Sequence, residues 1–148
     1  IVPYQAFEAS DGHVIVAVGN DSQFARFAEL AGHAEWAADE RFASNKARVL
    51  NRELLVPQIR EAMKTQPRAY WINGMEAAGI PGGPINTIAE ALAEPQVAAR
   101  QGVVEIAHPH GSVTMVANPI KFSKTPIRYD VAPPTLGQHS EQILGRLE

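Results

Sequence analysis

Apolar and polar residues alternate near the start of the chain in a way that predicts a β-hairpin. Phe7 and Ala9 flank a polar residue, and Ser10-Asp11-Gly12 supplies a turn. The run from His13 to Val18 is rich in β-branched residues, which favour strands. Two such runs joined by a short polar turn that contains glycine are typical of a hairpin.

The middle of the chain has the periodicity of amphipathic helices. The first helical stretch follows a strand end and helix cap at Gly19-Asn20-Asp21 and closes at Gly32, a residue suited to a helix C-terminus. Its apolar residues, spaced i, i+3, i+4 and i+7, are Phe24, Phe27, Ala28 and Ala31. A second helical period runs through 45–63, where Pro57 removes one backbone donor and predicts a kink.

Two further helices are marked by their ends. Pro67 predicts a helix start, and Gly79 supplies the left-handed C-terminal position, which Ile80 would cover. The inner face of this helix carries Trp71, Ile72, Met75 and Ala78. Thr87 and Glu90 have the spacing of a capping box, so a short helix is expected to follow.

The C-terminal third predicts another hairpin and short helices. Pro95 opens a helix through Ala99, and the stretches 103–107 and 112–117 read as two strands joined by a turn. Ser140 is expected to cap a last helix through Leu147. Two hairpins that enclose a helical middle predict an α+β fold, since the strand–helix–strand alternation of a parallel sheet is not sustained.

The segment 118–138 reads as an extended tail, because it combines little apolar periodicity with several prolines. These prolines are Pro119, Pro126, Pro133 and Pro134. We expect the tail to lie on a part of the protein outside this chain. The chain begins at Ile1, with neither Met nor a signal region, and we interpret it as a piece of a longer polypeptide.

Composition excludes several classes of function. The 148 residues include 13 Lys and Arg against 16 Asp and Glu, for a net charge of −3, which argues against a nucleic-acid binder. The chain has no cysteine, so disulfides, thiolate nucleophiles and cysteine-ligated zinc are excluded and a cytoplasmic location is favoured. The longest apolar run, Val14 to Val18, is far too short to span a membrane.

The polar residues do not assemble a complete catalytic set in the sequence. His108 and His110 share a turn, but zinc needs three or four converging ligands, so a solvated turn is favoured and no metal is expected. Gly111-Ser112 lacks the context of a nucleophilic serine. The four aspartates sit at turns, caps or exposed segments, where local backbone bonding explains them: they are Asp11, Asp21, Asp39 and Asp130.

The most unusual stretch is the glycine segment, Gly79–Asn86, in which two prolines bracket two glycines. Glycines allow another backbone or a ligand to approach closely, and prolines stiffen the path. It is not a phosphate-binding loop, because the Walker spacing and its lysine are missing. Two interpretations stay open: a rigid connection between helices, and a loop that faces a ligand.

Three segments in order and register resemble the C-terminal part of the family III CoA-transferases, which include formyl-CoA transferase, carnitine CoA-transferase and α-methylacyl-CoA racemase. They are Pro3–Phe7 running into Asp11–Asn20, Ala78–Asn86 leading to Pro95-Gln96-Val97, and Pro133–Ser140. The resemblance covers essentially the whole chain. The Pro84-Ile85-Asn86 form looks most like members that use dicarboxylate CoA esters such as succinyl-CoA.

The resemblance implies a larger enzyme. In the family, a Rossmann-like domain binds CoA and supplies an aspartate that becomes a mixed anhydride and then a thioester with CoA. That aspartate would lie upstream of this chain. On this reading, residues 1–117 resemble the small α+β domain and residues 118–148 a segment that returns to the large domain. Full-length members are expected to be interlocked homodimers, with CoA as a substrate and without a tightly bound cofactor.

No catalytic residue is therefore expected in this chain, and the fragment alone is expected to be inactive. A second domain that covers the acyl group would keep water from the intermediates. The residues expected to face the substrate are Gly19, Asn20, Gly82, Gly83, Pro84 and Asn86. The alternatives are a fragment of an α-methylacyl-CoA racemase and a non-catalytic interaction domain derived from the family.

Overall fold

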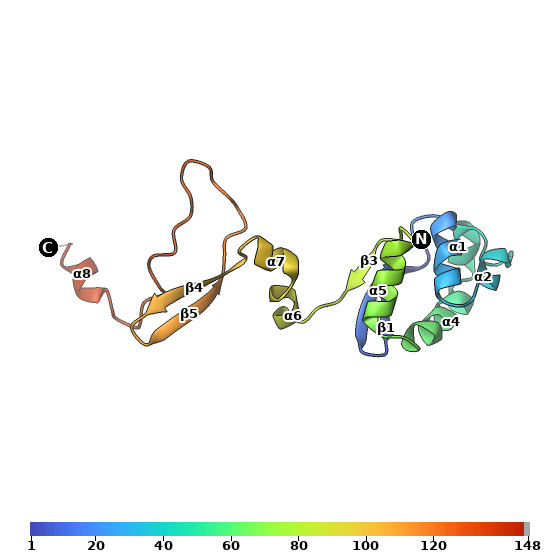
Figure 1. The fold of residues 1–148 in the computed structure, drawn as a ribbon, viewed down its shortest axis with the longest axis horizontal. Coiled ribbons are helices and arrows are strands. Elements are labelled where there is room, and N and C mark those ends of the chain that lie inside the picture. Colours follow the sequence, from blue (N-terminus) through green and yellow to red (C-terminus); the bar gives the residue numbers. More distant parts are fainter. Residues whose placement is uncertain (147–148) are drawn as a thin grey trace. The chain divides into compact units, whose positions relative to one another are not determined.

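The computed structural model describes residues 1–146, and its chain divides into two compact units. The first unit is Ile1–Ile85, and the second begins at Asn86. The first unit contains β1 (Tyr4–Ala9), β2 (Gly12–Ala17), α1 (Asp21–Leu30), α2 (Glu35–Ala38), α3 (Asn45–Leu50), α4 (Arg52–Lys64), α5 (Arg68–Ala77) and β3 (Gly82–Pro84) (Figure 1). The second contains α6 (Ile88–Leu92), α7 (Pro95–Ala99), β4 (Val103–His108), β5 (Gly111–Val116) and α8 (Ser140–Leu144). This mixture confirms the α+β prediction.

The first predicted hairpin is confirmed, but it belongs to a larger sheet. β1 and β2 pair antiparallel, with Ala9 opposite Gly12. β3 then pairs antiparallel with β2, placing β2 in the centre of a sheet with the order β1-β2-β3. The sequence did not predict β3, because a Gly-Gly-Pro strand has neither the β-branched residues nor the alternation of apolar side chains by which strands are recognised.

One face of this sheet packs against helices to form the core. α4 lies against β1, and α5 lies against β2 and β3, with α1 packed on α5 (Figure 1). Residues at alternate strand positions point into this layer, as the period of two requires. The largest fully buried side chains of the core include Phe7, Val14, Val16, Phe24, Phe27, Leu55, Ile59, Met63, Trp71 and Met75.

The β1–β2 turn also caps a helix. Pro67 occupies the N-cap position of α5 and provides no side-chain cap. Instead, Asp11 Oδ1 accepts a hydrogen bond of 2.7 Å from the Arg68 backbone N–H, and Ser10 N–H donates to Gln66 O at 3.0 Å. An aspartate that the sequence explains as a turn residue thus serves a helix far along the chain.

Replacing Asp11 by Ala should lower the free energy of unfolding by about 1 kcal/mol, the usual cost of losing a helix cap. Asp11→Asn keeps an acceptor oxygen and should retain most of the stability. Urea titration followed by tryptophan fluorescence measures the loss in the first unit, because the only tryptophans of the chain are Trp36 and Trp71. Equal losses in both variants would show that the charge, not the cap, matters.

The predicted helix over 45–63 is wrong as a single element. It is interrupted at Asn51, whereas α4 runs through Pro57 as one helix. The Asn51 Nδ2 group donates to Ala47 O at 3.0 Å and to Arg41 O at 3.1 Å. Asparagine side chains compete in this way with the helical backbone, which accounts for a break at Asn51.

A buried arginine ties the start of the chain to the helices. Arg48 has no solvent-exposed surface. Its guanidinium donates to Val2 O at 2.7 Å, to Phe42 O at 2.9 Å and to Asp21 Oδ1 at 2.9 Å. It also lies over the ring of Phe24, 4.2 Å from the centroid, which is a cation–π contact. Three carbonyl or carboxylate oxygens therefore share one cation inside the core.

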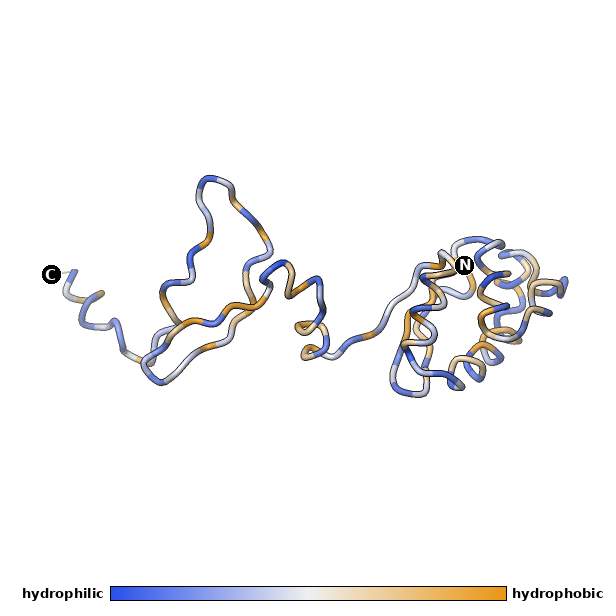
Figure 2. Tube along the Cα trace, viewed as in Figure 1, coloured by the Kyte–Doolittle hydropathy of each residue, from blue (hydrophilic) through white to orange (hydrophobic). Residues whose placement is uncertain are grey.

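The second unit contains the other predicted hairpin, β4 and β5. The capping box at Thr87 and Glu90 is also confirmed: Thr87 N–H donates to Glu90 Oε2 at 2.7 Å, and Glu90 N–H donates to Thr87 Oγ1 at 3.3 Å. Apolar residues recur along β4 and β5 as they do in the first unit (Figure 2). Among the described residues of this unit, however, the buried apolar ones are only Ile106 and Ala117.

The last helix differs from its prediction in where it begins, and it ends at Leu144 with Gly145 as its C-cap. His139 is its N-cap residue, and Ser140 is already inside α8. Leu147, where the prediction ended this helix, lies outside the described residues. Over residues 1–146, none of the helices has the length and apolar character needed to cross a membrane.

Candidate functional site

Gly19 and Asn20, the first two candidate residues, connect β2 to α1. Asn20 Oδ1 accepts a hydrogen bond of 2.9 Å from Gln23 N–H and one of 2.8 Å from the Ser22 hydroxyl. Asn20 is thus the N-cap of α1, within the stretch Gly19-Asn20-Asp21 that the sequence predicts as the cap. Its side-chain oxygen fixes the start of that helix. Val18 N–H donates to Pro3 O at 3.0 Å, which anchors the chain just before the turn.

The glycine segment begins at the C-terminus of α5. Gly79 has a φ of +65°, which glycine adopts without strain. Its N–H donates to Glu76 O at 3.0 Å, and Ile80 N–H donates to Met75 O at 2.8 Å. This is the Schellman arrangement, so the cap that the sequence predicts at Gly79 is confirmed.

The two central glycines of the segment have different surroundings. A Cβ atom on Gly82 would lie 2.7 Å from Ile15 O and 2.6 Å from Met75 Cε, so packing against β2 and α5 requires glycine there. A Cβ atom on Gly83 would meet no atom within 4 Å. Packing within the first unit therefore does not require glycine at position 83, and this position is open to contact with a group outside the unit.

The face of the sheet opposite the core carries a row of small and apolar residues, beside the polar pair Glu8 and His13. Ala6, Ile15 and Gly83 form one row across the three strands. Ile15 is 43% exposed and Tyr4, which shares the face, is 62% exposed. The open face of an antiparallel sheet is usually polar. The row of Ala6, Ile15 and Gly83 therefore gives this face an exposed apolar strip.

Side chains of α1 bind the start of the glycine segment. Gln23 Oε1 accepts from Gly19 N–H at 2.7 Å, while Gln23 Nε2 donates to Gly79 O at 3.2 Å. Arg26 Nε donates to Ala78 O at 2.7 Å. The structure thus brings Gly19 and the start of the glycine segment together through one side chain. The sequence analysis missed Gln23 and Arg26. The one feature that could have pointed to them is that they are three residues apart, and so lie on one face of the helix that Asn20 caps.

The remaining candidates are distributed over both units. Pro84 ends β3 in the first unit, where it pairs with Val14. Asn86 is the first residue of the second unit, and its Nδ2 group donates to Glu94 Oε1 at 2.8 Å. That bond spans α6 and holds the side chain of Asn86 within its own unit.

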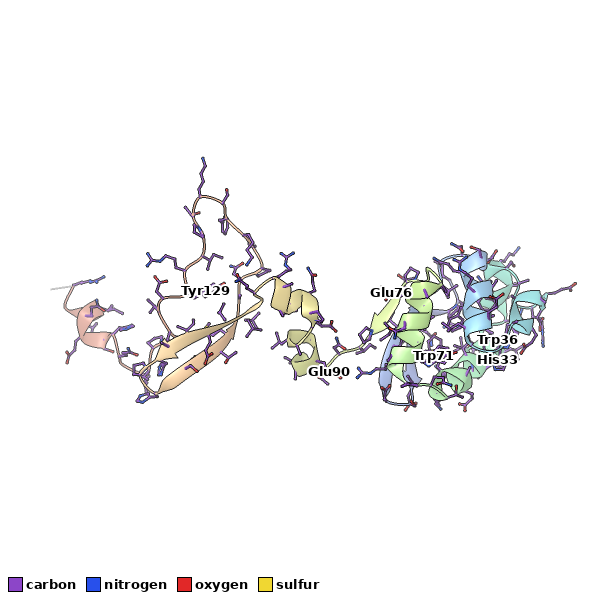
Figure 3. All side chains as sticks on the ribbon, viewed as in Figure 1. His33, Trp36, Trp71, Glu76, Glu90 and Tyr129 are labelled. Atoms are coloured by element: carbon purple, nitrogen blue, oxygen red, sulfur yellow. The ribbon has the colours of Figure 1, made fainter. Side chains whose placement is uncertain are left out.

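Each unit has surface hollows. In the first, a hollow of about 510 Å³ lies beside His33, Pro57 and Thr65. The His33 ring stacks on Trp36 with centroids 4.4 Å apart (Figure 3), and Trp36 Nε1 donates to a glutamine at 3.1 Å. In the second, a hollow of about 450 Å³ lies between β4 and the segment that carries Tyr129. Glu61 also lines the first hollow, but the polar side chains there bond to other partners. His33 pairs with Glu35, Glu61 accepts from Lys64, and the Thr65 hydroxyl donates to Ala62 O.

Two pairs of side chains on the surface of the first unit have perturbed pKa values. The Arg41 side chain donates hydrogen bonds to the Asp39 carboxylate and holds the pKa of Asp39 below its ordinary value. The His33 ring lowers the pKa of Glu35 in the same way. Within residues 1–146, no three His, Asp or Glu side chains are grouped to hold a metal ion.

The four aspartates have structural partners. Asp11 caps α5, and Asp21 accepts from Arg48 and, at 2.8 Å, from Asn45 N–H. Asp39 pairs with Arg41, and Asp130 pairs with Arg128. Two of these bonding patterns are local, as the sequence suggests, but those of Asp11 and Asp21 join distant segments.

Comparison with known proteins finds CoA-transferases that are similar to this chain over nearly its whole length. It is 39% identical to the succinate–glutarate CoA-transferase of Agrobacterium fabrum over 100% of its length, which is 37% of that protein. It is 35% identical to human succinyl-CoA:glutarate CoA-transferase over 97% of its length and 33% of that protein. The chain thus spans about a third of the length of these relatives.

A solved structure and a family model agree with these relatives. The crystal structure of a CaiB/BaiF family protein from Brucella suis matches all of this chain and 38% of its own, with a TM-score of 0.89 and 40% identity. The family model described as CoA-transferase family III matches residues 1–140. The chain belongs to CoA-transferase family III.

Proposed function

We propose that this chain is the C-terminal part of an enzyme that transfers CoA between carboxylic acids, with dicarboxylates such as succinate and glutarate among its substrates. The observation that carries the proposal is the 35–39% identity, over nearly the whole chain, to relatives whose names give succinate or succinyl-CoA and glutarate. CoA is then a substrate rather than a bound cofactor.

The proposed reaction exchanges one thioester for another. A carboxylate of the enzyme attacks the thioester carbonyl, which gives a mixed anhydride and CoA thiolate. The thiolate then attacks the enzyme's own acyl carbon, releases the donor acid and forms an enzyme–CoA thioester, from which the acceptor acid takes CoA by the reverse steps. We assign the attacking aspartate to the part of the polypeptide upstream of this chain.

The role left for the first unit is to cover the acyl group. Anhydrides and thioesters react with water, so a reaction of this kind needs a dry site. The apolar row of Ala6, Ile15 and Gly83 supports this role because an apolar surface excludes water. We propose that the open face of the sheet, together with Gly19 and Asn20, lies toward the substrate.

The second unit has a different proposed role. Its apolar side chains are largely exposed, including Val131 at 75%, Leu136 at 107% and Leu144 at 62%. An isolated domain rarely exposes so many. This supports the prediction that the segment from 118 onward packs on the large domain. The predicted boundary at residue 117, the interlocked dimer and the cytoplasmic location stay predictions.

The test uses the full-length protein in D₂O with a set of acyl-CoAs and carboxylic acids, followed by mass spectrometry. New CoA esters are expected and would identify the substrates. Deuterium at the α-carbon without ester exchange would instead assign the protein to the racemases. If neither product formed with succinyl-CoA and glutarate, the proposal would be wrong and an interaction domain would be favoured.

The two central glycines give a second test in the same enzyme. Gly83→Val should lower the turnover number roughly tenfold or more, because a branched side chain would project from the face proposed to meet the acyl group. Its free energy of unfolding should change by less than about 1 kcal/mol, since valine suits a strand.

The contrast is Gly82→Val, whose Cβ would lie 2.7 Å from Ile15 O. That variant should lose stability first, by about 1–3 kcal/mol, as overpacked sites do. Thermal unfolding and steady-state kinetics on both variants separate the two effects. An unchanged turnover number in Gly83→Val would argue against a substrate-facing role for β3.

A further inference from the structure

Helices α1 and α5 run antiparallel, and a ladder of contacts joins them. Tyr70 hydroxyl donates to Leu30 O at 3.1 Å, and Leu30 packs so closely on Gly74 that a Cβ there would lie 2.4 Å from Leu30 Cδ1. Further along, Arg26 binds Ala78 O. Residues later in α5 thus contact residues earlier in α1, and the series of contacts ends at the start of the glycine segment.

The end of α5 needs these contacts because the carbonyls of a last helical turn lack intrahelical donors. The Schellman bonds satisfy Met75 O and Glu76 O. Beyond them, Arg26 donates to Ala78 O and Gln23 donates to Gly79 O. The C-terminus of α5 is therefore completed by side chains from another helix.

Among these α1 residues, Gln23 binds two separate backbone segments, the one that follows β2 and the one that follows α5. Its amide oxygen accepts from Gly19 N–H and its amide nitrogen donates to Gly79 O. A single side chain with one acceptor and one donor thus joins the end of β2 to the entrance of the segment that forms β3. Two residues after Gly79, Pro81 O accepts from Ala17 N–H at 3.0 Å. This bond holds the glycine segment beside β2 just before the β2–β3 pairing begins.

We propose that Gln23 is a positioning residue for CoA transfer: it holds the glycine segment in the register that keeps Gly83 in the apolar row. The inference rests on the proposed function. Gln23 does not touch the reacting atoms; it acts through Gly79 and the strand that follows. Without the Gln23 side chain, the open face of the sheet would be held less firmly over the acyl group, and water would reach that group.

The expected consequence is that water competes more successfully with the acceptor acid for the reaction intermediates. In transfer, an acyl-CoA and an acceptor acid give a new CoA ester and the donor acid, with no free thiol. In hydrolysis, an acyl-CoA and water give the donor acid and free CoA thiol. If the open face of the sheet covers the site less tightly, the products shift from transfer toward hydrolysis. Water then attacks the anhydride or the enzyme–CoA thioester in place of the acceptor acid.

The experiment compares full-length wild type with Gln23→Ala and Gln23→Glu, using succinyl-CoA with glutarate. Free thiol and new CoA ester are measured in the same reaction, together with the turnover number and KM. Glu29→Ala, an exposed change on the same helix, is the matched control. Gln23→Glu retains an acceptor for Gly19 N–H but has no amide donor for Gly79 O, so it isolates the link to the glycine segment.

Gln23→Ala and Gln23→Glu are both expected to raise the ratio of hydrolysis to transfer about tenfold, while the melting temperature moves by less than about 3 °C. Amide exchange should quicken in peptides over residues 79–85 in both variants. The control should match wild type in all respects.

Several results would overturn the inference. An unchanged product ratio in both variants, or unchanged exchange over residues 79–85, would show that Gln23 does not position the segment. A fall in activity matched by an equal loss of stability would show a merely structural residue. If the wild type made no new CoA ester, the proposed function itself would fail, and the inference with it.

Discussion

Replacing Arg48 by Ala should lower the free energy of unfolding of the first unit by about 3–5 kcal/mol. The variant leaves the carbonyls of Val2 and Phe42 without their buried donor, and it opens a cavity beside Phe24. Urea titration of the chain, followed by tryptophan fluorescence, measures the loss. Because Val2 precedes β1, we expect the first strand to loosen with it.

Arg48→Lys is the informative control for this prediction. Lysine keeps the positive charge but lacks the planar fork that reaches several oxygens at once, so an intermediate loss is expected. Asp21→Asn should cost less than either, because the Asp21 side chain is 55% exposed and water can replace its partner. A loss below about 1 kcal/mol for Arg48→Ala would contradict the packing described for this residue.

Replacing Trp71 by Ala should cost a similar amount, about 3–5 kcal/mol, because it removes one of the largest buried side chains. The indole N–H donates to Met63 O at 2.9 Å, at the last turn of α4, so the variant also leaves that carbonyl without its donor. Fluorescence of the remaining Trp36 reports the transition.

Tyr70→Ala tests whether burial sets the size of this effect. Tyr70 precedes Trp71 on the same helix but is 43% exposed, and its hydroxyl makes one hydrogen bond to Leu30 O. We expect a loss of about 1 kcal/mol from that bond and the partial packing. Similar losses for both variants would show that α5 is held by its polar contacts rather than by the core.

The parts of the fold that the sequence predicts are those specified by short-range signals. The Thr87–Glu90 capping box, the Gly79 helix end and the Asn20 cap each depend on residues within a few positions of one another. The hairpins also follow from local alternation and turn residues. In each case, the partner that completes the bonding lies close in the chain.

Elements that depend on distant partners were missed. β3 exists because β2 offers it a hydrogen-bonding edge, and only glycine fits at position 82 because Ile15 and Met75 lie against it. The break at Asn51 depends in part on a bond to Arg41 O. Neither the edge nor that carbonyl is visible from the residues around the element itself.

The same limit applies to the candidate site. The sequence singles out glycines and prolines, since these residues constrain the backbone wherever they occur. It gives no reason to select Gln23, because a glutamine on an exposed helix face is ordinary until Gly79 is found beside it. It gives no reason to expect Arg48 in the core either, because arginine is almost never fully buried unless paired.

The brevity of β3 has a consequence for solubility. The outer edge of a sheet offers free N–H and C=O groups on which a second chain can pair and begin to aggregate. β3 covers that edge of β2 but is only three residues long, Gly82–Pro84. Its last residue has no N–H to offer, and proline on a sheet edge hinders further strand addition. The glycine segment therefore also protects this edge of the three-stranded sheet from pairing with another chain.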